Sequence, residues 1–206
     1  MKGDLYTIAF AGVLSAVCAL LLTGAAAVTA PYRENNAKIE EVQNILAALS
    51  VPLEEGESPA QLLEKFARNV REEKRGDVPF YVYSAPDTPD QPKALAVRFV
   101  GSGVWGPIEG FLALEPDMKT IRALAFAHQE ETPGLGGEIS ASWFRDQFVG
   151  KPVRDAAGRV GIVIGKAEAG PNAVNAITGA TMTSGKLETI LNDTLRKCVE
   201  DTHEQR

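Results

Sequence analysis

The residues best suited to hold a ligand form a short run, Thr178-Gly179-Ala180-Thr181-Met182-Thr183-Ser184, that stands directly before a predicted helix. A helix N-terminus presents unpaired N–H groups and a partial positive charge, which suit a phosphate. Gly179 and Ala180 leave the approach to these groups open. The alternative is a hydroxyl-rich turn that caps the helix without any ligand. The helix itself is predicted by apolar residues at helical spacing, namely Leu187, Ile190, Leu191, Leu195 and Cys198.

A second candidate is the glycine-rich segment Glu130-Glu131-Thr132-Pro133-Gly134-Leu135-Gly136-Gly137. Pro133-Gly134 is typical of the central pair of a type II turn, because proline sets φ at the first position and glycine adopts the positive φ of the second. The glycines leave backbone N–H groups open to a flat ligand. Turns of this composition are also common without any binding function, so both interpretations remain open.

A third segment, Gly101-Ser102-Gly103-Val104-Trp105-Gly106, has the spacing of a dinucleotide-binding loop. In that fold the third glycine opens a helix that receives the pyrophosphate. Here Pro107 and an apolar strand-like run follow, so the sequence predicts a glycine-rich hairpin connection. Trp105 is able to pack beside a flat ligand at such a turn, although packing in the core or the hairpin is the favoured interpretation.

Residue types needed for other chemistry are sparse. His128 is the single histidine of the folded body, because His203 lies in the polar C-terminal tail, and the two cysteines are Cys18 and Cys198. We therefore expect no metal site, no catalytic triad and no disulfide framework. The net charge of −6 argues against a nucleic-acid surface, which requires clustered lysine and arginine.

Residues 5–30 form a run of 26 consecutive uncharged residues. At about 1.5 Å per residue, a helix of this length crosses a ~30 Å hydrocarbon core. A cleaved signal peptide ending at Ala30 is the alternative, disfavoured because the run exceeds a signal core and Pro31 would follow the cut. A stripe suited to contact with a neighbouring transmembrane helix is formed by small residues, namely Gly12, Ala16, Ala19 and Thr23.

Helices are expected before the strands of the folded body. An amphipathic helix continues from the apolar run and ends before Pro52, and its apolar positions are Ile39, Val42, Ile45, Leu46 and Leu49. Ser58 and Gln61 match a capping box for a second helix, whose predicted buried stripe comprises Leu62, Leu63, Phe66 and Val70. The charge-rich residues 68–77 are expected to be a solvated face or a linker.

From residue 80 onward the pattern changes to short β-prone runs separated by turn signals. An order of helices, then a meander of strands, then further helices predicts an α+β fold with an antiparallel sheet. The predicted strands are residues 80–84, 94–100, 108–114, 121–127 and 160–164.

Four blocks of this sequence carry a family resemblance: residues 33–38 with 44–46, residues 105–115, residues 128–138 with Trp143 and 150–151, and residues 178–184. Together they resemble the C subunit of the sodium-pumping NADH:quinone reductase family. The last two blocks are also shared by the related G subunit of the Rnf electron-transfer complex, whereas the second, Trp105 to Glu115, is more similar to the reductase. The C subunit of the reductase is therefore the preferred resemblance.

The resemblance implies that FMN is joined covalently, through its phosphate, to Thr181. Thr178, Gly179 and Ala180 belong to the same motif, whose first position is Asn175 where the family has aspartate. The resemblance also places Thr183 among the cofactor-binding residues. Around the flavin ring it implies Trp105, Glu131, Thr132, Gly134 and Leu135.

The fold implied is a single N-terminal transmembrane helix followed by an antiparallel-sheet FMN-binding domain with flanking helices. We expect an anchor over residues 1–30, a helical connecting region over 31–77 and the FMN-binding domain over 78–206. The domain would lie on the extracytoplasmic side of the bacterial inner membrane. A flavin transferase would attach the FMN.

The function implied is electron relay within a sodium-translocating NADH:ubiquinone reductase, with other membrane subunits as partners. No catalytic residue is assigned, so the chain would be an electron-transfer subunit rather than a complete enzyme. Three alternatives remain open at this point: the G subunit of an Rnf-type ferredoxin:NAD oxidoreductase, a freestanding extracytoplasmic FMN-binding protein, and a non-enzymatic assembly module.

Overall fold

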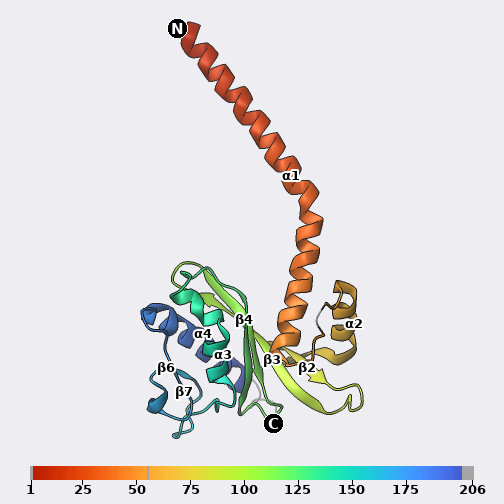
Figure 1. Ribbon diagram of the computed structural model, residues 1–206, viewed down its shortest axis with the longest axis vertical. Helices are drawn as coiled ribbons and strands as arrows, with labels where there is room; N and C mark the ends of the chain where they lie inside the picture. The colour runs from red at the N-terminus through yellow and green to blue at the C-terminus, as the bar shows by residue number, and fades with distance from the viewer. Residues whose placement is uncertain (1, 55, 201–206) are drawn as a thin grey trace. The chain divides into compact units, whose positions relative to one another are not determined.

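The computed structural model describes residues 2–54 and 56–200, so His203 lies outside the described residues. The chain divides into two compact units, residues 1–40 and 41–206, and the helix α1 (Lys2–Ala48) contributes to both. The second unit contains a sheet with helices on its two faces (Figure 1). It also carries every residue predicted to bind a ligand.

A five-stranded antiparallel meander forms the centre of the second unit, in the order β1-β2-β3-β4-β5 (Figure 1). Four of the five predicted strands are confirmed as members of this sheet, and the predicted fold class is confirmed with them. The strands are β1 (Val70–Arg75), β2 (Val78–Ser84), β3 (Pro92–Ser102), β4 (Pro107–Leu114) and β5 (Ile121–His128).

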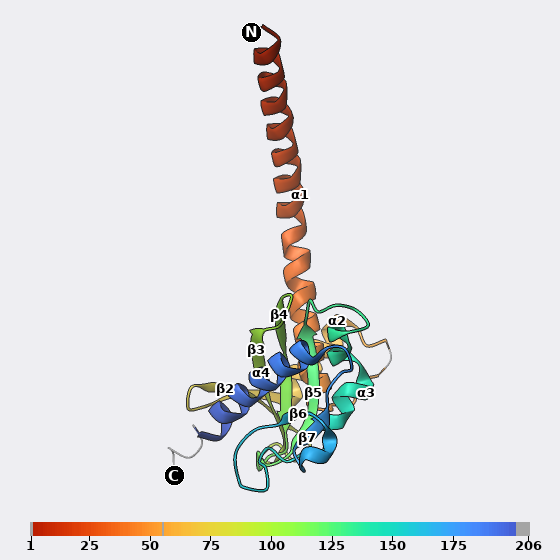
Figure 2. The same cartoon turned by 90° about the vertical axis from the view of Figure 1, so that its left-hand side faces the viewer.

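The main core lies between one face of the sheet and the helix α4 (Thr181–Glu200), which lies across the strands (Figure 2). All five residues predicted for the apolar face of this helix are buried. At Gly101 a Cβ atom would lie 2.3 Å from Cγ1 of Ile190, so the missing side chain lets α4 approach β3 closely. Sheet residues of this core include Phe80, Val82, Leu95, Val97, Phe99, Leu112 and Leu124.

The opposite face of the sheet is covered by the end of α1 and by α2 (Pro59–Asn69). Glu41 of α1 pairs with Arg98 of β3 at 3.9 Å, and the ring of Tyr81 contacts those of Phe66 and Phe111. The predicted capping box at Ser58 and Gln61 is confirmed. The predicted stripe of α2 is only partly correct, because Leu63 is exposed and Val70 belongs to β1.

The charge-rich residues 68–77 are not a linker, because most of them form the edge strand β1 and its turn into β2. Arg71 and Arg75 each pair with Glu73 at 3.5 Å, so charges lie along the strand that has a free edge. Charged side chains on an edge strand prevent pairing with another chain. The solvated face was thus predicted correctly, but its secondary structure was not.

The predicted strand at 160–164 is also wrong in part, because it does not join the antiparallel sheet. β6 (Val163–Gly165) pairs in parallel with β7 (Ala173–Asn175) in a separate two-stranded sheet. Short helices complete the unit: η1 (Gly136–Ser140), α3 (Ser142–Arg145), η2 (Asp146–Phe148) and η3 (Ala167–Ala169).

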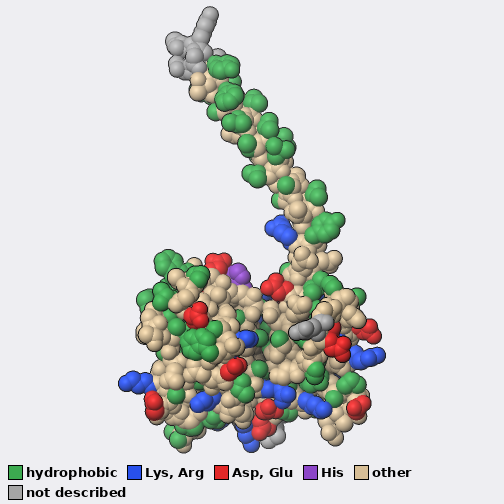
Figure 3. All heavy atoms as spheres, in the orientation of Figure 1, with side chains coloured by type: hydrophobic (Ala, Val, Ile, Leu, Met, Phe, Trp, Pro, Cys, Tyr) green, Lys and Arg blue, Asp and Glu red, His purple; other side chains and the backbone are tan. Residues whose placement is uncertain are grey.

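Within the described residues, α1 is one helix that is long and apolar enough to cross a membrane, judged by length and composition. Its first part exposes large hydrophobic side chains such as Tyr6, Leu14 and Leu21 (Figure 3). An N-terminal signal sequence would satisfy the same criterion. The helix ends at Ala48, as expected for an amphipathic continuation that stops before Pro52.

Candidate functional site

Three segments that are distant in the sequence line an open cavity of about 430 Å³. This volume lies within the range of about 300–1,000 Å³ that is common for ligand pockets. Eight of the ten residues predicted to bind the cofactor line it, whereas Thr178 and Gly134 do not. The lining consists of Val104, Trp105, Glu131, Thr132, Leu135, Gly136, Gly179, Ala180, Thr181, Met182 and Thr183.

The first wall is the hairpin between β3 and β4. Gly103 N donates to the carbonyl oxygen of Gly106 at 2.8 Å, and Ser102 pairs with Pro107, so the predicted hairpin connection is confirmed. Trp105 is 71% exposed. The favoured interpretation was packing in the core or the hairpin, and its core part is therefore wrong. Trp105 lies at the rim of the cavity.

The second wall is the loop that follows β5. Leu135 N donates to the carbonyl oxygen of Thr132 at 3.1 Å, and Gly134 has a φ of +74°. These are features of a type II turn, as the Pro133-Gly134 pair predicts. Gly137 N donates to the same Thr132 oxygen at 2.9 Å, so the turn is compact and leaves the Leu135 side chain exposed at the cavity.

The third wall is the N-terminus of α4. A turn closed by the bond from Ala180 N to the carbonyl oxygen of Ile177, 3.0 Å, leads into the helix, with Gly179 at a φ of +79°. Ala180 precedes the first helical residue and has no side-chain acceptor to cap it. Among the described residues, the N–H groups of Thr181, Met182 and Thr183 have no hydrogen-bond acceptor. These donors are therefore free to bind an anion.

The side chains of the first helical turn differ in their surroundings. Thr181 and Met182 are exposed on the wall of the cavity, whereas Thr183 is buried. The Thr183 hydroxyl donates to Oε2 of Glu131 at 2.6 Å. Thr181 thus provides a hydroxyl that is open to modification at the uncapped N-terminus of α4.

Glu131 connects the walls of the cavity. Its carboxylate is buried, with the residue 4% exposed, and Oε1 accepts from the backbone N–H of Val104 at 2.7 Å and of Trp105 at 3.2 Å. Burial alone would raise the pKa of this carboxyl group. The hydrogen bonds from the Thr183 hydroxyl and from the two backbone N–H groups outweigh it and hold the pKa below its ordinary value.

We expect this lowered pKa to make the stability of the chain depend on pH. At pH values above about 4.5, the ordinary pKa of this carboxyl group, the lowered pKa adds to the free energy of unfolding. This contribution is lost as pH falls through the pKa of the folded state. Glu131→Gln removes the titrating group. The difference in free energy of unfolding between the two chains, measured by chemical denaturation in detergent, should shrink from neutral pH to about pH 3. A difference that stays constant over this range would contradict the expectation.

Asn175, at the first position of the motif, lies at the end of β7 and does not line the cavity. Its Oδ1 accepts from Ala167 N at 3.0 Å, and its own N–H donates to Oε1 of Gln147 at 2.9 Å. An aspartate at this position would offer the same acceptor oxygen. The departure from the family pattern therefore leaves the walls of the cavity unchanged.

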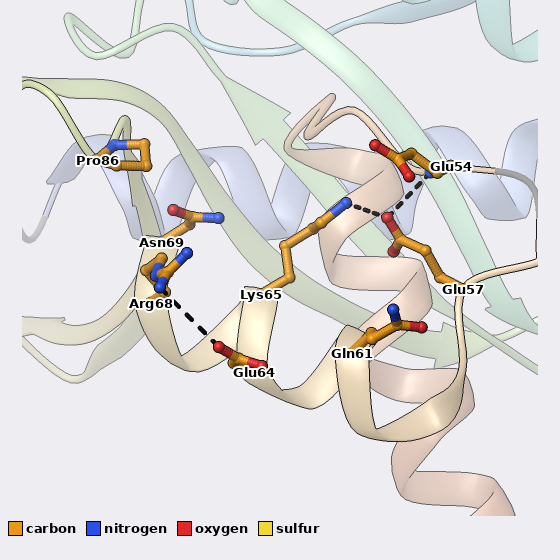
Figure 4. Close-up of a pocket in the computed structure, with 8 residues that line it drawn as sticks. All are labelled: Glu54, Glu57, Gln61, Glu64, Lys65, Arg68, Asn69 and Pro86. Carbon is orange, nitrogen blue, oxygen red and sulfur yellow. Dashed lines mark hydrogen bonds and ion pairs between the residues drawn. The ribbon is translucent and has the colours of Figure 1, made fainter.

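Another hollow, of about 280 Å³, lies beside α2 (Figure 4). Its lining is largely charged, and Lys65 at its centre pairs with Glu57 and donates to the carbonyl oxygen of Pro52 at 2.9 Å. None of the ten residues predicted to bind a cofactor lines it. In the part of the chain that the structure describes, no group of three or more His, Cys, Asp or Glu residues is placed to hold a metal ion.

Residues 103–196, which carry the cavity, match the model of the FMN-binding domain family. More particularly, the chain is similar to the C subunit of Na(+)-translocating NADH-quinone reductase. It is 38% identical to that protein of Pasteurella multocida over 106 residues, and 41% identical to that of Yersinia pestis over 95 residues. The alignments cover 50% and 45% of this chain, but 40% and 36% of the relatives, so the chain matches less than half of their length.

Solved structures agree with this resemblance. The crystal structure of the same reductase component from Parabacteroides distasonis aligns with a TM-score of 0.69 and 26% identity, over 83% of this chain and 95% of that chain. Shewanella oneidensis NqrC has the same fold, with a TM-score of 0.65 at 20% identity over 77% of this chain and 93% of that chain. The resemblance inferred from the four sequence blocks is confirmed.

Proposed function

We propose that this chain carries FMN in a phosphoester bond to Thr181 and relays electrons within a sodium-translocating NADH:quinone reductase. One observation supports the site above all: the exposed Thr181 hydroxyl stands at an uncapped helix N-terminus on the wall of a ligand-sized cavity. The similarity to C subunits of Na(+)-translocating NADH-quinone reductase supports the complex. The G subunit of the Rnf complex is the nearest rival, and the Pasteurella and Yersinia relatives favour the reductase.

The residues around the cavity fit FMN. The free N–H groups of Thr181, Met182 and Thr183 suit a phosphate, whose negative charge is stabilised at a helix N-terminus. Trp105, Leu135 and Met182 offer exposed apolar surface for a flat ring system. An aromatic side chain is well suited to packing beside such a ring.

Bound FMN would supply reversible oxidation and reduction, while the protein sets its position and surroundings. A phosphoester leaves the ring system unsubstituted, so Thr181 would fix the cofactor without touching the redox atoms. Covalent attachment also makes occupancy independent of free flavin concentration. The hydroxyl–carboxylate pair of the cavity, Thr183 with Glu131, is buried, and we propose that substrate chemistry depends on partner subunits.

The direct test is to produce the full chain with and without a flavin transferase and to run the purified protein on a denaturing gel. We expect a fluorescent flavin band at the mass of the chain only when the transferase is present. Normal assembly of the complex without any bound flavin would favour an assembly module instead. Electron transfer to a small acceptor without partner subunits would favour a freestanding flavoprotein.

We further propose that α1 anchors the chain in the bacterial inner membrane, with the FMN-binding domain on the extracytoplasmic side. The 26 uncharged residues support anchoring. Sequencing of the N-terminus of the mature chain separates an anchor from a signal peptide, because cleavage after Ala30 would remove the apolar run. Protease digestion of intact spheroplasts tests the side on which the domain lies.

A charge placed in the middle of the apolar run should weaken the anchor. We expect Val17→Arg to reduce the fraction of chain retained in membranes after carbonate extraction, because arginine at the centre of a transmembrane helix costs about 2.5–3.5 kcal/mol. Glu34→Arg, which changes charge outside the run, is the matched control and should be retained like the wild-type chain. Equal retention of all three chains would contradict an anchor over residues 5–30.

A further inference from the structure

Both carboxylate oxygens of Glu131 accept hydrogen bonds from other segments of the chain. Oε1 accepts two backbone N–H groups of the β3–β4 hairpin, 26 and 27 residues earlier in the chain. Oε2 accepts the Thr183 hydroxyl, 52 residues later. One buried carboxylate therefore links the segment that carries Trp105 to the helical turn that begins at Thr181.

Two glycines make the space in which this carboxylate lies. A Cβ atom on Gly103 would lie 2.4 Å from Oε1 of Glu131. A Cβ atom on Gly136 would lie 2.8 Å from Oε2 and 2.5 Å from the Thr183 hydroxyl oxygen. A real Cβ atom essentially never makes a non-bonded contact closer than 3.0 Å, so the missing side chains on both sides leave room for the Glu131 carboxylate and its bond to Thr183.

We propose that Glu131 is a positioning residue, which holds the Trp105 hairpin and the first turn of α4 in place before FMN is attached. This inference rests on the proposed attachment of FMN to Thr181. Without the carboxylate, the hairpin and the helix move independently, and Trp105 no longer stays beside the attachment site. The attachment of FMN is then slower, because the cavity must be assembled during the reaction.

Two substitutions separate positioning from general destabilisation. Thr183→Val removes the hydroxyl but keeps the size of the buried side chain, whereas Thr183→Ser keeps the hydroxyl. We expect Glu131→Ala and Thr183→Val to slow covalent flavin incorporation roughly tenfold or more, because a hydrogen bond to a charged group is lost. Thr183→Ser should incorporate flavin faster than Thr183→Val, because it restores the hydroxyl that Glu131 accepts. The double variant, Glu131→Ala with Thr183→Val, should incorporate flavin no more slowly than Glu131→Ala alone, since both changes break the hydrogen bond between these two residues.

A measurement on flavin-free chain keeps this inference separate from the proposed function. The chain has two tryptophans, so Trp143→Phe leaves Trp105 as the single tryptophan, which is excited selectively at wavelengths that the four tyrosines do not absorb. In that background, Glu131→Ala and Thr183→Val should lower the fluorescence anisotropy of Trp105 in the folded, full-length protein. Glu130→Gln is the matched control, because the hydrogen bond of Glu130 goes to His128 and glutamine keeps the size of the side chain that packs against Gly106, so it should leave anisotropy unchanged.

The outcomes are distinct. Lowered anisotropy together with slow incorporation supports the positioning role. If the wild-type chain takes up no covalent flavin but Trp105 still loosens in the variants, the proposed function fails while the link from Glu131 to the hairpin stands. Unchanged anisotropy, or flavin incorporation at the wild-type rate in both Glu131→Ala and Thr183→Val, overturns the proposal.

Discussion

Replacing Thr181 with valine is expected to abolish covalent flavin completely. Valine has nearly the shape of threonine, and the side chain is exposed, so the substitution should leave the fold intact while removing the one oxygen proposed to form the phosphoester. The chain would be produced with a flavin transferase and analysed by in-gel fluorescence. No band is expected for this variant at any protein loading.

Two matched variants test whether loss of the flavin band in Thr181→Val is specific to the hydroxyl of that residue. Thr189→Val changes an exposed threonine of α4 that lies outside the motif and does not line the cavity, and it should keep the fluorescent band. Thr181→Ser retains a hydroxyl at the same position and should keep at least part of the band. A band of wild-type intensity in Thr181→Val would show that flavin is attached elsewhere or is held without a phosphoester at this residue.

The largest expected effect on stability comes from a position inside the sheet. Gly110→Ala should lower the free energy of unfolding by about 3 kcal/mol, because overpacking at a buried site costs about 1–3 kcal/mol and more where the backbone must shift. A Cβ atom at this position would lie 2.2 Å from the carbonyl oxygen of Ala125 and 2.5 Å from the ring of Phe99. The glycine is therefore required by the strands on both sides.

The register explains why a glycine is tolerated there. Gly110 of β4 is paired with Phe99 of β3 on one side and with Phe126 of β5 on the other. The two rings meet edge to face with centroids 5.7 Å apart, so they cover the gap that the missing side chain leaves. Aromatic neighbours commonly compensate a glycine within a sheet in this manner.

Gly165→Ala is the matched control for the sheet prediction. Gly165 also lies in a strand, but its Cβ atom would have a single neighbour, at 4.0 Å, which is ordinary van der Waals contact. Chemical denaturation of the three chains under the same conditions gives the comparison. Equal midpoints for Gly110→Ala and Gly165→Ala would show that β4 accommodates a side chain at residue 110 and that the close packing around Gly110 is wrong.

Sequence patterns predicted the parts of the fold in which apolar periodicity is strong. The strands β2 to β5 and the buried face of α4 were found in this way, because each carries apolar side chains into one core. The strand β1 was missed because every residue after Val70 in it is charged and none of these charged residues is buried. Its pairing with β2 is a tertiary effect that local pattern does not contain.

The site was predictable to the extent that it lies in contiguous motifs. Eight predicted residues line the cavity, while Val104, Gly136 and Met182 were missed although each adjoins a predicted residue in the sequence. These three residues line the cavity because of the curvature of the turns, not because of their residue types. The exposure of Trp105 was likewise not predictable, since tryptophan at a hairpin is equally suited to packing.

The bond between Thr183 and Glu131 could not be predicted from either motif alone. The two residues are 52 positions apart, and neither spacing nor composition indicates that a buried carboxylate joins them. The glycines at 103 and 136 gave the only sequence signal, but glycine is frequent in turns wherever the backbone needs a positive φ. The close approach of the Glu131 carboxylate supplies the reason for both glycines.

The most direct test of the proposed phosphoester is mass spectrometry of peptides from the purified chain after production with a flavin transferase. We predict that the peptide containing Thr181 carries an added mass equal to FMN less one water, and that fragmentation places this mass on Thr181 rather than on Thr178 or Thr183. An unmodified Thr181 peptide in a preparation with full flavin content, or the same mass located on another residue, would contradict attachment at Thr181.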